Sequence, residues 1–77
     1  MKSVEIRLNS ADKVKSFNQT ICKYKDDCDL SWGHYVVDAK SIVGIFTLNL
    51  AENLVLTING EDADAIIDEI RPYLISA

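Results

Sequence analysis

The hydrophobic pattern of this chain changes its period several times, and these changes constrain the fold more than any single motif does. Near the N-terminus Val4, Ile6 and Leu8 alternate with polar residues, which is the pattern of a half-buried strand. The segment 53–60 alternates in the same way through Leu54, Leu56 and Ile58. We therefore predict one strand at each of these places, with one face toward the core.

Helical spacing replaces this alternation in two longer segments. In "NSADKVKSFNQTICKY" Asn9 or Ser10 is a candidate N-cap, and Asp12 lies where the helix dipole favours an anion. The apolar residues that follow at helical spacing are Val14, Phe17, Ile21 and Tyr24. A second amphipathic helix is predicted from about Asp62, and Pro72 should thin or kink its last turn.

The middle of the chain reads as a hairpin followed by a short helix. Cys28, Leu30 and Trp32 alternate, Gly33-His34 is a turn signal, and a second strand follows over 35–39. The segment 41–49 is then a short helix. The predicted order is strand, helix, strand, strand, helix, strand, helix.

This order predicts a single domain over residues 1–77, an α+β open-faced sandwich with helices on one face of a sheet. The other face should be solvated. Residues expected on that face are Glu5, Arg7, Asp29 and Thr57.

Composition excludes several classes of function. The net charge of −4 repels nucleic-acid phosphates, and no Lys/Arg cluster alternates with aromatics, so we expect no nucleic-acid binding. Cys22, Cys28 and His34 do not have metal-ligand spacing, and we expect two reduced thiols, no metal and no cofactor. Apolar runs are too short to span a membrane and the N-terminus lacks a signal sequence, which predicts a soluble, cytoplasmic protein.

Two stretches carry a resemblance to a known family. "AKSIVGIFTLNL", residues 39–50, is similar to the segment around the regulatory serine of HPr, the histidine-containing phosphocarrier protein of the sugar phosphotransferase system. "CKYKDDCDL", residues 22–30, resembles the family's connection from the first helix to the second strand. The resemblance covers essentially the whole chain. It implies a four-stranded antiparallel sheet with three helices on one face, in the order βαββαβα.

The family's active-site motif, Gly-x-His-Ala-Arg-Pro before the first helix, is absent here. In a gapless count Ser10 lies at the position of the histidine, Asp12 at that of the arginine and Lys13 at that of the proline, while Ala11 matches. A serine hydroxyl without an adjacent base is a weak phosphoryl acceptor, and Asp12 repels phosphate. His34 is interpreted as a solvated turn residue. We therefore expect no catalytic residue and no enzymatic activity.

Ser41 has two compatible interpretations. Serine is a preferred N-cap, which accounts for its position at the head of a helix. The resemblance adds that the matching serine of HPr is phosphorylated by a dedicated kinase in many Gram-positive bacteria, and a phosphate is favoured at a helix N-terminus. Ser41 is thus both a cap and a candidate regulatory phosphorylation site.

The apolar residues after Ser41 exceed what one face of a short helix can bury. If Ile45, Leu48 and Leu50 point inward, a second set remains on or near the surface as a candidate partner site, unless Phe46 folds back over the edge of the core. This set is Ile42, Val43 and Phe46.

The favoured hypothesis is a regulatory or docking module of the phosphotransferase or carbon-control network that cannot carry phosphohistidine. Its expected partners are proteins of that network, such as a serine kinase or a transcription regulator. The first alternative is an atypical phosphocarrier that uses Ser10 or His34. The second is a small α+β domain with no role in phosphotransfer.

Overall fold

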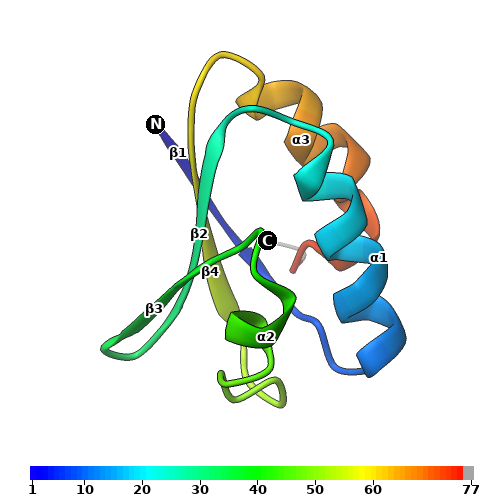
Figure 1. The fold of residues 1–77 in the computed structure, drawn as a ribbon, viewed down its shortest axis with the longest axis vertical. Coiled ribbons are helices and arrows are strands. Elements are labelled where there is room, and N and C mark those ends of the chain that lie inside the picture. Colours follow the sequence, from blue (N-terminus) through cyan, green and yellow to red (C-terminus); the bar gives the residue numbers. More distant parts are fainter. Residues whose placement is uncertain (76–77) are drawn as a thin grey trace.

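Four strands, three α-helices and one 3-10 turn make up the fold in the computed structural model, which describes residues 1–75 (Figure 1). The elements are β1 (Lys2–Ile6), α1 (Ala11–Cys22), β2 (Asp27–Trp32), β3 (Tyr35–Asp38), α2 (Ile42–Ile45), β4 (Leu54–Asn59), α3 (Ala63–Glu69) and a 3-10 turn, η1 (Arg71–Tyr73). The predicted order βαββαβα is confirmed.

The strands form one antiparallel sheet in the order β1-β4-β2-β3. Figure 1 shows α1 and α3 side by side over one face of this sheet, with the short α2 on the same side near β3. The predicted open-faced α+β sandwich is therefore confirmed, and within the described residues no helix covers the other face of the sheet.

The period-2 alternation separates the two faces of the sheet as predicted. On β4, Leu54, Leu56 and Ile58 are fully buried, and burial of one such side chain contributes about 1.5–3 kcal/mol. Helix α1 covers this layer with its buried residues Val14, Phe17 and Ile21. Of the residues expected on the solvated side, Glu5, Arg7 and Asp29 are exposed and Thr57 is half-buried.

Element boundaries differ from the prediction where tertiary contacts decide them. Strand β1 ends at Ile6, yet Leu8 beyond it is still fully buried. Ala39, expected within the hairpin, lies after β3 and is also fully buried. Near the C-terminus α3 stops at Glu69 and a 3-10 turn containing Pro72 follows, because proline cannot continue the helical hydrogen-bond ladder.

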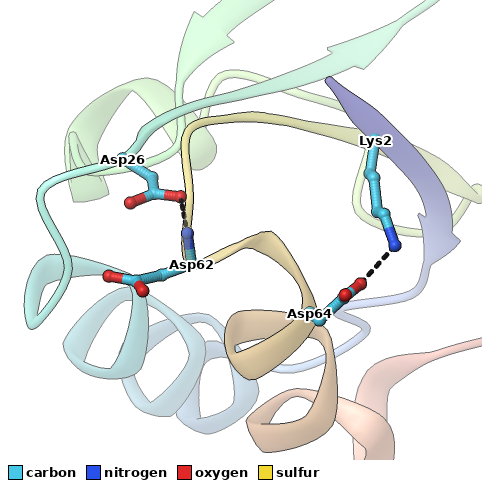
Figure 2. Close-up of polar contacts among 4 residues, drawn as sticks. All are labelled: Lys2, Asp26, Asp62 and Asp64. Carbon is cyan, nitrogen blue, oxygen red and sulfur yellow. Dashed lines mark hydrogen bonds and ion pairs between the residues drawn. The ribbon is translucent and has the colours of Figure 1, made fainter.

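Two polar contacts connect the start of α3 to β1 and to the turn that precedes β2 (Figure 2). The buried carboxylate of Asp26 accepts a hydrogen bond from the backbone N–H of Asp62 at 2.9 Å. Lys2 on β1 forms an ion pair with Asp64 in the first turn of the helix. A Cβ atom at Gly60 would lie 2.3 Å from Cγ of Asp26, so this close approach requires glycine.

Candidate functional site

Side chains at the start of α1 hydrogen-bond to the helix backbone and to each other. Ser10 is the N-cap, and its Oγ accepts a hydrogen bond from the N–H of Lys13 at 3.2 Å. Lys13 also donates through Nζ to Oδ1 of Asn9 at 3.0 Å. Asp12 is exposed in the first turn. The choice between Asn9 and Ser10 as cap is thereby decided for Ser10, whose hydroxyl oxygen serves the helix backbone.

The only histidine of the chain lies elsewhere. His34 is exposed in the turn between β2 and β3, after Gly33, whose φ of 59° suits the first central position of a two-residue hairpin. Figure 1 places this turn and the start of α1 at opposite sides of the molecule. The structure therefore does not bring an imidazole to Ser10, and each residue has to be judged by its own surroundings.

Ser41 caps α2 in the way the sequence predicts. Its Oγ accepts a hydrogen bond from the N–H of Gly44 at 3.2 Å, and its backbone is extended. The residue is exposed at the surface. Lys40 beside it does not reach toward this hydroxyl, because its Nζ donates to the carbonyl oxygen of Tyr24 at 2.8 Å. Ser41 thus combines a capping role with an accessible oxygen.

The surface of α2 carries a smaller apolar patch than predicted. Val43 is 74% exposed and Phe46 is 45% exposed, so Phe46 does not fold away over the core. Ile42 was expected in the same patch, but it is half-buried and packs against the core. Helix α2 contacts both β3 and α1. We refer to Val43 and Phe46 as the α2 patch.

The inward set is largely as expected. Ile45 is fully buried and Leu48 nearly so, while Leu50 is half-buried and packs against the core. These side chains hold the four-residue helix on the sheet and leave the α2 patch facing solvent.

Contacts from α1 hold the segment that leads into α2, and the sequence pattern does not reveal them. Nδ2 of Asn18 donates to the carbonyl oxygen of Ala39 at 3.2 Å, and Sγ of Cys22 donates to that of Lys40 at 3.7 Å. Both donors stand on the polar side of a helix, where spacing alone predicts solvent exposure. Together with the Lys40 bond to Tyr24 they connect the C-terminal half of α1 to the start of α2.

The two thiols differ in their surroundings. Cys22 is exposed, whereas Cys28 is buried in the sheet and its pKa is raised to about 11 by desolvation, against the opposing effect of Lys40. Within residues 1–75 no group of three or more His, Cys, Asp or Glu side chains could hold a metal ion. No helix in the described part of the chain is long and apolar enough to cross a membrane.

An antiparallel sheet in the order β1-β4-β2-β3, covered on one face by three helices, defines the protein as a βαββαβα open-faced sandwich. A family model described as "PTS HPr component phosphorylation site" matches residues 5–75. The chain therefore belongs to the HPr family of the phosphotransferase system.

Solved structures of the family show the same fold. HPr-C-His from Thermoanaerobacter tengcongensis is 26% identical, with a TM-score of 0.81 over 94% of this chain and 89% of that chain. The phosphocarrier protein HPr from Bacillus anthracis is 26% identical, with a TM-score of 0.74 over 96% and 94%. The catabolite repression protein Crh from Bacillus subtilis is 25% identical, with a TM-score of 0.70 over 91% and 82%. Comparison with curated proteins finds no significant match.

Proposed function

We propose that this HPr-family protein is a regulatory or docking module of the phosphotransferase or carbon-control network and does not carry phosphohistidine. The observation that supports this most is the location of the only histidine, His34, in the β2–β3 turn rather than at the start of α1. The start of α1 has Ser10 there instead, as a helix cap.

The chemistry at α1 argues against phosphoryl transfer. A phosphohistidine carrier requires an imidazole nitrogen that attacks phosphorus at neutral pH. The hydroxyl of Ser10 accepts the N–H of Lys13, and no basic side chain hydrogen-bonds to it among the described residues. Asp12 in the first turn adds a negative charge that would repel an incoming phosphate.

The remaining functional surface is the start of α2. Val43 and Phe46 expose apolar area beside the accessible hydroxyl of Ser41. A phosphate on Ser41 would lie near free backbone N–H groups at the start of α2. Phosphorylation would therefore change the charge beside the α2 patch without destabilising the helix. Ser41 would in this way regulate which proteins the α2 patch binds.

The proposed partners are proteins of the same network, among them a serine kinase that modifies Ser41 and a transcription regulator that binds the product. The likeness to Crh, which is described as a catabolite repression protein, supports a regulatory role of this kind. The two thiols, the exposed His34 and the uncovered sheet face have no part in this proposal.

A pull-down with the purified protein tests the docking surface. We expect Phe46→Asp to reduce the recovery of phosphotransferase or carbon-control proteins about tenfold, because a charge in an apolar contact is costly to desolvate. The matched control is Val55→Asp, which places the same charge at an exposed residue on β4. Bound proteins are identified by mass spectrometry. Identical partner sets for wild type and Phe46→Asp contradict a docking role of the patch.

A further inference from the structure

The two edge strands of the sheet differ in whether another segment of the chain hydrogen-bonds to them. Along β1 the C-terminal segment supplies hydrogen bonds, from Ile75 N–H to the carbonyl oxygen of Glu5 at 3.0 Å and from Arg7 N–H to that of Tyr73 at 2.9 Å. The opposite edge is β3, and within residues 1–75 no segment pairs with its outer side. Figure 1 shows β3 and its turn projecting from the body of the molecule.

The backbone groups on this open edge can be identified from the ladder. Ala39 N–H donates to the carbonyl oxygen of Cys28 at 2.8 Å, and hydrogen-bonded pairs alternate along an antiparallel ladder. Val37 and Tyr35, two and four residues earlier, are therefore the hydrogen-bonded partners of β2. The N–H and C=O groups of Val36 therefore point away from β2, where they are available to another strand, whereas the carbonyl oxygen of Asp38 already accepts a hydrogen bond from Ser41 N–H at 2.9 Å.

The side chains of β3 do not protect this edge. Tyr35 is 66% exposed on one face and Val36 is 64% exposed on the other. The strand contains no lysine, proline or bulge, which are common devices that prevent pairing at a sheet edge. Tyr35 also stacks on Trp32 at the hairpin end, with ring centroids 6.2 Å apart and planes 9° from parallel, so the strand carries a packed aromatic pair.

One register of antiparallel pairing makes β3 complementary to itself. With Val36 opposite Val36 of a second copy, Tyr35 lies opposite Val37, and His34 lies opposite Asp38. A twofold axis perpendicular to the sheet generates this register and keeps the solvated face of each copy on the same side. Apolar side chains then meet on both faces of the new strand pair, which is the arrangement that stabilises cross-strand contacts.

Charge favours the same register. Within one chain Asp38 stands opposite Asp29, and like charges directly opposite each other are destabilising. The ammonium group of Lys40 donates to the carbonyl oxygen of Tyr24, whereas its backbone N–H donates to Oδ1 of Asp38 at 2.9 Å. In the twofold register the imidazole of His34 from the second copy reaches Asp38 and supplies a hydrogen-bond donor to its carboxylate.

We propose that β3 is a self-association surface, on which a second copy of this chain adds its own β3 to form one continuous antiparallel sheet. The open hydrogen-bonding groups of Val36, the exposed Tyr35 and Val36, and the His34–Asp38 complementarity all point to this occupant. A single strand pair buries little area, so the dimer is weak and forms at high protein concentration. The inference is independent of the function proposed for α2.

Sedimentation equilibrium over a wide concentration range tests the association. The wild-type mass should rise from the 8.6 kDa monomer toward the dimer. Val36→Lys should weaken association roughly tenfold or more, since it puts two like charges directly opposite each other. Val55→Lys, at an exposed valine on the inner strand β4, should associate as wild type does. Circular dichroism confirms that both variants are folded.

A disulfide trap tests the register. In a Cys22→Ser background, Val36→Cys should form an intermolecular disulfide under mild oxidation, because directly opposite residues have Cα atoms close enough to be bridged. Val43→Cys on α2, which is more exposed, should not. A wild-type protein that stays monomeric, a dimer that survives Val36→Lys, or equal cross-linking of the two cysteine variants overturns the proposal.

Discussion

Ser10 and Ser41 are both helix N-caps, but their surroundings differ. Ser10 caps α1 through Lys13, and Ser41 caps α2 through Gly44, each at 3.2 Å. Both caps could be predicted, because serine before a run with helical spacing is a strong N-terminal signal. What distinguishes them is their neighbours: Asp12 lies in the first turn of α1, whereas the first turn of α2 has no acidic residue. We therefore propose Ser41, rather than Ser10, as the site of phosphorylation.

Burial predicts which of the two cysteine thiols reacts. Cys28 is 2% exposed and its pKa is raised to about 11, so very little of it is thiolate at mildly alkaline pH. We expect iodoacetamide to modify only Cys22 in the native protein and both cysteines in urea, as measured by intact mass. Cys22→Ser should then gain no adduct under native conditions. Equal rates at the two cysteines would contradict the buried environment of Cys28.

The hydrophobic period predicts where the helices and strands lie, but it does not predict the residues at which they end. The alternation in β4 predicts its core face because every second residue points to the same side of the sheet. Leu8 continues the period of β1 but lies beyond its end at Ile6, next to Arg7, whose N–H bonds to Tyr73 on the outer edge of the sheet. Ile42 was placed on the surface by helix geometry, but it is half-buried and packs against the core. Contacts between distant segments leave no periodic signal in a sequence.

We make one prediction for the turn that joins β4 to α3. Gly60→Ala should lower the free energy of unfolding by about 1–3 kcal/mol, because the new methyl group would overlap the carboxylate of Asp26. Urea denaturation measures this. In an Asp26→Ala background the same substitution should cost less, since two of the three overlapping atoms are gone. Equal costs in the two backgrounds would show that the contact with Asp26 is not what requires glycine at position 60.

Over the whole molecule, the fold could be predicted and the function of its surfaces only in part. The order of strand-type and helix-type hydrophobic patterns, together with the resemblance around Ser41, was sufficient to predict the four-stranded sandwich and the HPr family. Asp26 shows the limit: a "KDD" run reads as a solvated turn, yet this carboxylate is buried against the N–H of Asp62. The open edge of β3 is a second case, because only the strand order shows which strands lie at the edges.

The function proposed for this protein depends on which of its groups accepts phosphate. Intact mass is measured after two separate incubations, one with phosphoenolpyruvate and enzyme I and one with an HPr serine kinase and ATP, with a histidine-carrying HPr as positive control for the first. We predict no adduct in the first and one phosphoryl group in the second, lost in Ser41→Ala. An acid-labile phosphoryl adduct in the first incubation, on His34 or Ser10, would contradict the account.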